Sequence, residues 1–223
     1  MSRNPFDPTY DQLPATIPVF PLTGALLLPR GRLPLNIFEP RYLAMVKDAL
    51  AADRMIGMIQ PQGAVSNNGM ARDPALYEIG CAGRITSFAE TDDGRMLITL
   101  TGVCRFTVGQ ELPTTRGYRR VMPDWSPFQA DLEEVEATCL DRDRLTSGLK
   151  AYFKQCGISA NWEAIEQTPD ERLVHSLAMI CPFEPTEKQA LLEAPDLPSR
   201  AQMLLALIEM AVHDVPGGDA AKH

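Results

Sequence analysis

The residues best suited to chemistry in this sequence are an acid, a base and a phenol that lie within four positions, Glu39, Arg41 and Tyr42. Side chains of these types act as general acids and bases when a substrate lies between them. The stretch holds no nucleophile, however, and Pro40 suits the first turn of a helix, because its missing N–H would have no partner there. Arg41 is disfavoured by the positive end of that helix and needs a carboxylate, for which Glu39 is the nearest candidate. We therefore predict a corner that joins a strand to a helix, and not a catalytic site.

The histidines give no second candidate for catalysis. The chain has three, His175, His213 and His223, and their wide spacing indicates neither a metal cluster nor a nucleophile–base pair. His175 falls within a predicted helix, where a structural histidine is favoured over a general base. The sequence also lacks the glycine-rich phosphate loop, the dinucleotide fingerprint, the HExxH pair and the GxSxG elbow. We predict a protein that is not an enzyme and that needs no cofactor or metal, with an unrecognised hydrolase as the alternative.

The cysteines and the hydropathy pattern indicate a soluble, cytoplasmic protein. No two of the five cysteines form a CxxC pair, so their spacing excludes a zinc ribbon and a thioredoxin-type motif. Their odd number and their apolar neighbours favour reduced, mostly buried thiols. The N-terminus carries no apolar signal-peptide core, and no apolar run approaches the roughly 20 residues of a membrane span.

The net charge of −8 belongs to the second half of the chain. Residues 1–125 hold 13 Lys and Arg against 12 Asp and Glu, whereas residues 126–223 hold 8 against 17. An acidic surface repels phosphate groups, so we do not expect the second half to bind nucleic acid or an anionic membrane. The nearly neutral first half remains open to such binding.

Two groups of arginines in the first half could hold a phosphate chain if they met on one face. The first group is Arg30, Arg32 and Arg41, and the second is Arg116, Arg119 and Arg120, beside Tyr118. The alternative, which the balanced charge favours, is that these arginines are solvated and pair with acids of the helical half. RNA binding by the second group is therefore kept as the second hypothesis.

Short strands are predicted throughout the first half. They cover residues 16–22, 32–38, 54–60 and 117–123, with two longer strands within 77–108. Prolines confine the first two segments to edges, ends or bulges of a sheet. Asp93-Gly94 marks a hairpin turn between the longer strands, because glycine tolerates the positive φ of a tight turn. The strand after this turn is partly apolar on both faces, which favours a closed or heavily packed barrel over an open sheet.

Helices are predicted for the second half. From Asp131 the apolar residues recur at intervals of three and four, which predicts a long amphipathic helix with one interruption near residues 141–143. Shorter helices follow, with Thr168 and Thr186 as predicted N-caps. The closing helix has Pro198 at its start. An order of strands first and helices afterwards is typical of an α+β fold.

The predicted organisation has four parts and two notable loops. The parts are an N-terminal tail over 1–13, a β-barrel over 14–125, a helical bundle over 126–215 and a disordered tail over 216–223. Residues 61–76 are rich in Pro, Gly and Asn and are expected to form a long mobile loop, of a kind that is often functional. A more apolar loop contains Leu26, Leu27 and Leu28, which are either buried in the core or exposed for a partner.

Three segments together resemble the N-terminal substrate-binding domain of the ATP-dependent Lon protease. They are Phe20-Pro21-Leu22, Phe38-Glu39-Pro40-Arg41-Tyr42 and Gly102-Val103-Cys104-Arg105-Phe106, within a resemblance that extends over roughly residues 14–212. The resemblance implies a PUA-like β-barrel followed by a C-terminal helical bundle. Lon proteases continue into an ATPase module and a Ser–Lys protease domain, which this sequence lacks. The chain thus looks like a free-standing Lon-domain protein, for which the resemblance implies no protease activity.

The resemblance also implies a role in recognising unfolded or tagged polypeptides. The leading hypothesis is therefore a non-catalytic polypeptide-binding module of protein quality control, whose partner is such a polypeptide or another protein. We expect an apolar groove between barrel and bundle to accept hydrophobic side chains. The predicted binding residues are Leu26, Leu27, Leu28, Arg30, Arg41 and Tyr42. Neither nucleic acid nor a membrane is the expected partner.

Overall fold

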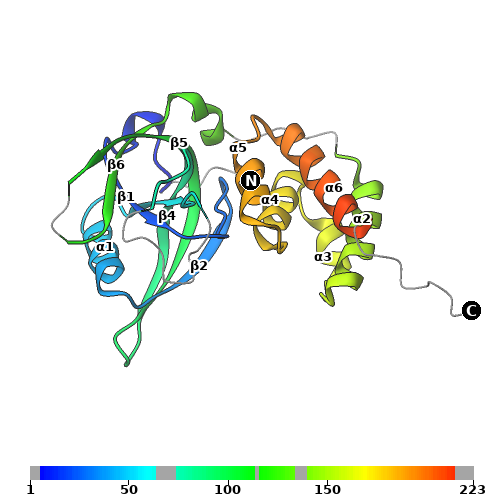
Figure 1. Ribbon diagram of the computed structural model, residues 1–223, viewed down its shortest axis with the longest axis horizontal. Coiled ribbons are helices and arrows are strands. Elements are labelled where there is room, and N and C mark those ends of the chain that lie inside the picture. The colour runs from blue at the N-terminus through cyan, green and yellow to red at the C-terminus, as the bar shows by residue number, and fades with distance from the viewer. Residues whose placement is uncertain (1–5, 64–73, 114–115, 134–139, 214–223) are drawn as a thin grey trace, which may run out of the picture. The chain divides into compact units, whose positions relative to one another are not determined.

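The computed structural model of the protein describes residues 6–63, 74–113, 116–133 and 140–213 (Figure 1). The chain forms two compact units. The first holds Met1–Glu134 and Met179–Glu193, and the second holds Val135–Ala178 and Ala194–His223. Most of the loop predicted over 61–76 and all of the tail predicted over 216–223 lie outside the described residues.

The first unit is built on a mixed sheet of six strands in its described part (Figure 1). They are β1 (Ile17–Pro21), β2 (Arg32–Ile37), β3 (Met55–Ile59), β4 (Ile79–Glu90), β5 (Met96–Leu112) and β6 (Arg119–Asp124). The order is β2-β5-β4-β3-β1-β6, and β5 also pairs with β6. β1 runs parallel to β3, and the other pairs are antiparallel. The predicted strands and the α+β class are confirmed.

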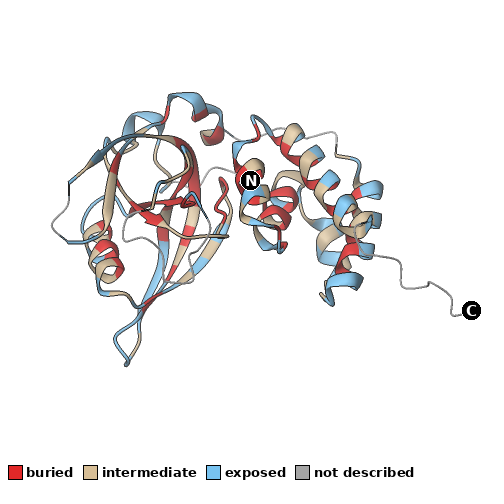
Figure 2. Cartoon of the chain, viewed as in Figure 1, coloured by how far each residue is buried: buried red, intermediate tan, exposed pale blue. Residues whose placement is uncertain are grey.

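β4 and β5 form a long hairpin whose turn is the one that Asp93-Gly94 predicts. Gly94 has a φ of +82°, and its N–H donates to the carbonyl oxygen of Thr91 at 3.0 Å. The N–H of Thr91 donates to the carbonyl oxygen of Arg95 at 3.1 Å, which is the first rung of the ladder after the turn. From Thr86 to the turn β4 is exposed, so the outer end of the hairpin is largely surrounded by solvent (Figure 2).

The predicted corner is confirmed. The other elements of the first unit are η1 (Tyr10–Gln12), α1 (Pro40–Leu50), η2 (Ser126–Leu132) and α5 (Pro185–Glu193). Glu39 is the N-cap residue of α1, and Pro40 is its first residue. Arg41 forms the expected ion pair with Glu39 at 2.9 Å. The ring of Tyr42 packs on Phe20 with the ring centroids 4.2 Å apart, so the phenol serves the core.

Phe106 of β5 lies in the core of the first unit. Its side chain is fully buried, and its ring centroid lies 5.7 Å from that of Trp125 in an edge-to-face arrangement. Gly57 on β3 and Gly80 on β4 face this ring, and a Cβ atom there would lie 2.8 and 2.7 Å from Phe106 Cζ. Because cores are closely packed, neither position can hold a larger residue without displacing the ring.

α5 is attached to the sheet by buried polar side chains. Gln60 Nε2 donates to the carbonyl oxygen of Pro185 at 2.8 Å and to Gln189 Oε1 at 3.2 Å. Gln189 Nε2 donates in turn to the carbonyl oxygen of Ile79 at 3.1 Å, at the start of β4. Buried polar groups are costly unless they are bonded, so these directional contacts hold α5 in one position on the first unit.

This attachment means that the compact units do not follow the predicted boundary. We expected residues 126–215 to form one helical part, whereas the first unit extends to Glu134 and also takes in α5. The predicted N-cap of α5 is wrong as well. Thr186 lies inside the helix, and the N–H of Glu184 donates to the Glu187 carboxylate at 2.8 Å.

The second unit is helical in its described part. Its helices are α2 (Arg142–Cys156), α3 (Trp162–Gln167), α4 (Asp170–Ile180, with its last two residues in the first unit) and α6 (Leu197–His213). Asp141 caps α2 by accepting a hydrogen bond from the N–H of Arg144 at 3.0 Å. The part of the helix predicted after the interruption is confirmed as α2, the prediction is wrong for residues 131–132, and residues 134–139 lie outside the described residues. Residues 126–132 form η2, and α2 starts where the interruption was predicted.

Thr168 does not cap α4 as predicted. Its hydroxyl donates to the carbonyl oxygen of Ala164 at 2.6 Å, at the end of α3. The backbone of α4 starts one residue later, where the N–H of Leu173 donates to the carbonyl oxygen of Pro169 at 2.9 Å. Pro198 does lie in the first turn of α6, as predicted. A capping pattern in sequence thus located the helix ends but not the groups that satisfy them.

Candidate functional site

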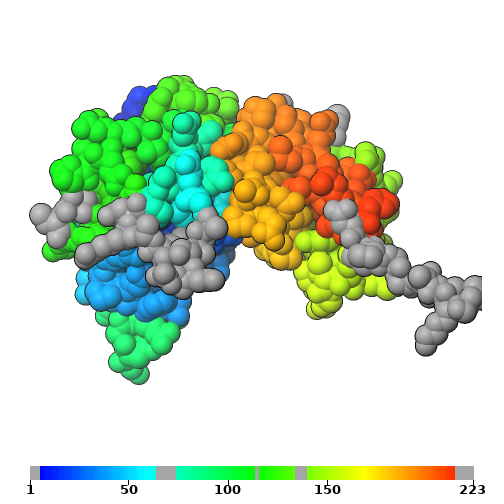
Figure 3. Space-filling model, viewed as in Figure 1, coloured from blue at the N-terminus to red at the C-terminus, as the bar shows by residue number. Residues whose placement is uncertain are grey.

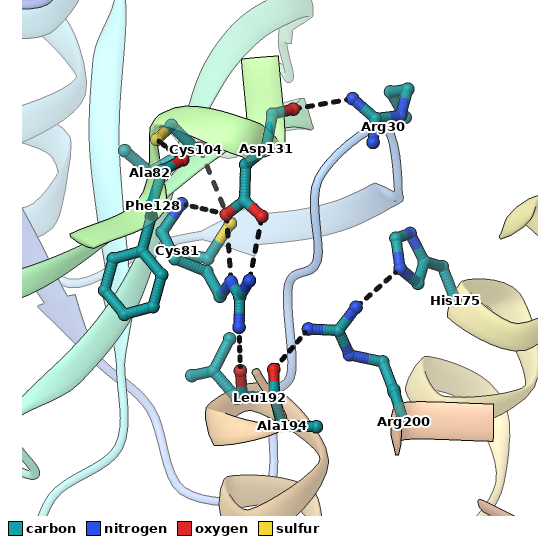
Figure 4. A network of polar contacts seen from close by, with 11 residues as sticks. Arg30, Cys81, Ala82, Cys104, Phe128, Asp131, His175, Leu192, Ala194 and Arg200 are labelled. Atoms are coloured by element: carbon teal, nitrogen blue, oxygen red, sulfur yellow. Dashed lines mark hydrogen bonds and ion pairs between the residues drawn. The ribbon is translucent and has the colours of Figure 1, made fainter. Parts of the chain in front are cut away.

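The most buried charged cluster of the first unit is the ion pair between Arg105 of β5 and Asp131 of η2, whose side chains are 4% and 9% exposed. Arg105 donates from Nε and Nη2 to the two carboxylate oxygens, each at 2.9 Å (Figure 4). The backbone N–H of Arg105 donates to Asp131 Oδ2 at 3.0 Å, and Nη1 donates to the carbonyl oxygen of Leu192 at 3.1 Å. The cluster thereby joins β5, η2 and α5.

This cluster is not a catalytic site. Both carboxylate oxygens of Asp131 are already bonded to Arg105, so neither is free to act as a base. The neighbouring thiol of Cys104 donates to the carbonyl oxygen of Phe128 at 3.3 Å. Burial, with a further contribution from the charge of Asp131, raises the pKa of Cys104 to about 12. A thiol that stays protonated at neutral pH is a poor nucleophile, so the cluster is structural.

A sequence signal for this cluster was overlooked. Arg105 stands between Cys104 and Phe106 in a strand that is predicted to be packed on both faces. An arginine in such a position is buried and needs a carboxylate partner. Asp131 lies 26 residues further along the chain, so spacing could not have identified it as that partner.

Metal ligands, the buried histidine and helix hydropathy bear on catalysis and on membrane anchoring in the described residues. Within the described ranges, no group of three His, Cys, Asp or Glu side chains lies close enough to hold a metal ion. His175 of α4 is buried, and its Nε2 lies 2.9 Å from Nη1 of Arg200, in keeping with a structural role (Figure 4). No helix in the described part of the chain combines the length and hydropathy needed to span a membrane.

The three leucines predicted to bind polypeptide lie in the core. Leu26, Leu27 and Leu28 are 3%, 1% and 0% exposed. The loop that carries them lies against β5, where a Cβ atom on Gly102 would be only 2.0 Å from the carbonyl oxygen of Leu28. Of the two alternatives for this loop, burial is the one that holds. The leucines have almost no exposed surface for a peptide and are not part of the candidate site.

The polar members of the predicted set are also engaged. Arg30 Nη1 donates to the carbonyl oxygen of Asp131 at 2.7 Å, and Arg41 is paired with Glu39. Tyr42 is 7% exposed, and burial raises the pKa of its phenol. These three residues stabilise the fold of the first unit and do not line an open surface together with the leucines.

The arginines proposed for RNA binding have partners within the first unit. Arg116 pairs with Asp48. Arg119 makes a bidentate pair with Glu111, in which Nε and Nη2 each lie 2.7 Å from a carboxylate oxygen. Arg119 also lowers the pKa of Glu111 through these hydrogen bonds. Arg120 donates to the hydroxyl of Thr16 at 2.7 Å. The expectation of pairing is met, but the acids come from the first half and not from the helical half.

The candidate binding surface is instead a group of exposed apolar side chains at the outer end of the β4–β5 hairpin. Phe38, Phe88 and Leu97 are 62%, 55% and 48% exposed, and we call these three the hairpin patch. In the space-filling view the tip of the hairpin, coloured green near residue 90, projects from the first unit (Figure 3). Large apolar side chains that stay exposed at one end of a hairpin are typical of interaction sites.

The sheet register places Phe38 and Leu97 on one face of the sheet and Phe88, which lies opposite Ile98, on the other face. Leu97 lies directly opposite Asn36 of β2 on one side and Ala89 of β4 on the other, so the three side chains share a face. Phe38 follows Asn36 by two positions, and the guanidinium of Arg95 lies 6.0 Å from the centre of its ring. Sequence alternation located Leu97 on a strand but gave no sign that this strand would project into solvent.

A charged pair borders the patch. Arg95 Nε lies 2.8 Å from Asp93 Oδ2. The hydroxyl of Thr91, and then the charge of Arg95, hold the pKa of Asp93 below its ordinary value. Glu90 and Asp92 lie in the same stretch, so residues 90–95 hold three acids against one base and the rim of the patch is acidic.

Comparison with known proteins agrees with the resemblance. A family model described as the ATP-dependent protease La (LON) substrate-binding domain matches residues 16–210. Lon protease 2 of Myxococcus xanthus is 27% identical over 201 residues, covering 89% of this chain but 24% of that protein. The Lon protease of Anaeromyxobacter dehalogenans (strain 2CP-C) is 26% identical over 202 residues, covering 89% and 23%. The chain thus spans about a quarter of the length of these relatives.

Two solved structures share the fold. The crystal structure of a Lon N-terminal domain protein from Xanthomonas campestris has a TM-score of 0.58 and 25% identity, with 86% of this chain and 97% of that chain covered. The N-terminal domain of a Mycobacterium avium complex Lon protease has a TM-score of 0.58 and 16% identity, covering 90% and 100%. Because the family model spans most of the sequence, this chain belongs to the family of Lon substrate-binding domains.

Proposed function

We propose that the protein is a non-catalytic polypeptide-binding module of cytoplasmic protein quality control, which holds apolar side chains of unfolded or tagged polypeptides on the hairpin patch. The observation that carries the proposal is the exposure of Phe38, Phe88 and Leu97 at the projecting end of one hairpin. Membership of a family named for substrate binding supports the same function. β6, the last strand in the order, also pairs with β5, and this pairing supports a PUA-like barrel as the fold that carries the hairpin patch.

The chemistry of the patch suits weak and reversible capture. Complete burial of one leucine or phenylalanine side chain contributes about 1.5–3 kcal/mol, while association costs at least about 4 kcal/mol in lost freedom. A partner must therefore contact Phe38 and Leu97 together on one face of the sheet, or reach around the hairpin to Phe88 on the other face. Unfolded chains present many apolar side chains, whereas folded proteins bury most of theirs, so the patch selects for the unfolded state.

The test replaces Phe38, Phe88 and Leu97 by serine together. All three side chains are largely exposed, so the free energy of unfolding should change little. Binding is followed by crosslinking and by fluorescence anisotropy with a permanently unfolded, labelled model protein. The triple variant should lose at least ten-fold in affinity.

Met122→Ser supplies the matched control, because Met122 is also exposed (43%) but lies on β6, away from the hairpin turn. It should bind the unfolded protein as the wild type does. Equal affinity of the triple variant and the wild type would rule out the patch. An equal loss in the Met122 variant would show that binding depends on general surface hydrophobicity and not on this hairpin.

RNA binding receives no comparable support. Each of the three arginines proposed for it already has a partner in the first unit, namely Asp48, Glu111 or Thr16. A phosphate chain would have to displace these contacts. The same anisotropy assay with a single-stranded RNA should therefore show no binding that weakens steeply with salt.

A further inference from the structure

β2 lies at the end of the strand order and pairs with β5 on one side. A strand in this position presents a row of backbone N–H and C=O groups on its other side, and such a row can pair with a further strand. β2 spans Arg32–Ile37, which is long enough to hold a short segment in register. The hydrogen-bonding pattern of the β4–β5 hairpin determines which backbone groups of β2 point to β5 and which point away from the sheet.

The hairpin turn determines which residues of β5 direct their backbone N–H and C=O groups to β4 and which direct them to β2. The N–H of Thr91 donates to the carbonyl oxygen of Arg95, so these two residues form a hydrogen-bonded pair across the hairpin. Hydrogen-bonded pairs recur at every second residue of an antiparallel ladder. Leu97 and Thr99 therefore direct their backbone groups to β4, opposite Ala89 and Ser87. The residues between them direct theirs to β2.

The alternation continues into β2. The residues of β2 that bond to β5 are Leu33, Leu35 and Ile37, opposite Leu100, Ile98 and Met96. Arg32, Pro34 and Asn36 must then direct their backbone groups away from the sheet. Two observations agree with this assignment. Pro34 has no N–H and would break the ladder if it faced β5, and the N–H of Gly102, in the same alternation as Leu100, donates to Gly31 at 2.8 Å.

The outer side of β2, which we call the open edge, therefore carries three carbonyl oxygens and two N–H groups. The carbonyls belong to Arg32, Pro34 and Asn36, and the N–H groups to Arg32 and Asn36. Among the described residues, no hydrogen bond reaches any of these groups. Backbone groups of this kind require a partner, which is either water or another chain.

We infer that the open edge pairs with an extended segment of a non-native polypeptide, which joins the sheet as an added strand beside the hairpin patch. The inference rests on the proposed function and specifies how the polypeptide is held. Only a segment whose own backbone is unpaired can satisfy the edge, which excludes helices and folded surfaces that lack an open strand edge. Backbone pairing tolerates many sequences, while Phe38, two positions after Asn36, favours an apolar side chain at that end of the added segment.

The edge also discriminates against a second copy of this chain. It has three acceptors but only two donors, because Pro34 supplies a carbonyl and no N–H. A foreign segment without proline supplies the missing donor opposite Pro34. The open edge of a second copy would also have three carbonyl acceptors and only two N–H donors, so two such edges could not satisfy all their carbonyls. The occupant that complements the edge is therefore an extended, proline-free segment of another polypeptide.

The first test uses labelled heptapeptides of alternating leucine and threonine. In one peptide the backbone nitrogens of the leucines are methylated, and in another those of the threonines. In the bound peptide the backbone N–H groups of alternate residues point to β2, and those of the remaining residues point to solvent. The peptide that is methylated on the N–H groups facing β2 should bind at least ten-fold more weakly, while the other methylated peptide should match the parent. Equal affinity of all three peptides would overturn the inference, and so would an equal loss in both methylated peptides.

The second test uses the protein. Asn36→Pro removes one of the two outward N–H groups but leaves the ladder to β5, so it should weaken binding of the parent peptide about five-fold. Asn36→Ala, the matched control, keeps the N–H and should bind normally. Leu35→Pro removes a ladder bond and should lower the melting temperature, which checks the assigned direction. An Asn36→Pro variant that is folded and binds normally would contradict the inference.

The outcomes separate this inference from the proposed function. If the serine variants of the hairpin patch bind weakly while Asn36→Pro and both methylated peptides bind normally, polypeptides are held by side chains and the open edge is not used. If the serine variants bind normally, the proposed function fails first. The peptide experiment does not depend on the stability of any variant, so it gives an answer even if Asn36→Pro unfolds.

Discussion

Replacing Asp131 by alanine leaves the guanidinium of Arg105 buried without its carboxylate. Three hydrogen bonds are lost, from Nε, Nη2 and the backbone N–H of Arg105, at 2.9, 2.9 and 3.0 Å. The side chain of Arg105 is 4% exposed, so water cannot replace them without opening the structure. Breaking a buried pair in this way costs about 3–5 kcal/mol, which is a large part of the roughly 5–15 kcal/mol that stabilises a folded domain.

Urea unfolding measures this cost for one unit at a time, because each unit has its own tryptophan. Trp125 lies in the first unit and Trp162 in the second. In a Trp162→Phe background, fluorescence follows the first unit. The Asp131→Ala change should then lower the midpoint by about 1.5–2.5 M urea, for a slope of about 2 kcal/mol per M. In a Trp125→Phe background, the second unit should show a far smaller shift.

A double variant separates the charge from the packing. In Asp131→Leu combined with Arg105→Met no unpaired charge remains, so most of the lost stability should return. A loss below about 1 kcal/mol for Asp131→Ala would refute our account of the ion pair as the junction of β5, η2 and α5. No recovery in the double variant would show that the hydrogen-bonded shape of the pair matters more than its charge.

Three further predictions concern thiol reactivity, the pH dependence of stability and the packing of the first unit. In a Cys139→Ser background, Cys156 should react with a thiol reagent within minutes at pH 8, because it is exposed, while Cys104 should stay unreacted in the native protein. The pKa of Cys104 is raised to about 12, so the folded state keeps a proton that the unfolded state loses above its ordinary value of 9.0, and the free energy of unfolding should fall as pH rises from 9 to 12. Gly102→Ala should lower the free energy of unfolding of the first unit by about 1–3 kcal/mol in urea, because the new Cβ would lie 2.0 Å from the carbonyl oxygen of Leu28. A stable Gly102→Ala variant, or rapid modification of Cys104, would contradict the packing described.

The features predicted well from the sequence are those that depend on neighbouring residues. The hairpin turn at Asp93-Gly94 and the corner at Glu39 and Arg41 need only local backbone geometry and one short-range ion pair. The capping predictions show the limit of such reasoning. Thr168 has the right type and spacing to cap α4, but its hydroxyl donates to the carbonyl oxygen of Ala164 in the preceding helix at 2.6 Å.

The features that were missed depend on contacts between distant parts of the chain. α5 belongs to the first unit because Gln189 bonds to Gln60, 129 residues away. Periodicity shows that α5 is a helix but not where it packs. The hairpin patch was missed for a related reason, since Leu97 alternates with buried residues as any core strand does. Its exposure depends on how far the hairpin projects beyond the strands that flank it.

Because residues 179–193 belong to the first unit, this unit is built from two stretches of the chain that are not contiguous in sequence. The first unit is interrupted after residue 134, resumes at residue 179 with the segment that holds α5, and ends at residue 193. No single cut therefore separates two self-sufficient fragments. A fragment that stops at residue 134 would leave Gln60 and Arg105 without their acceptors on α5. Recombination between related genes should thus preserve function only when both stretches of the first unit are inherited from the same parent.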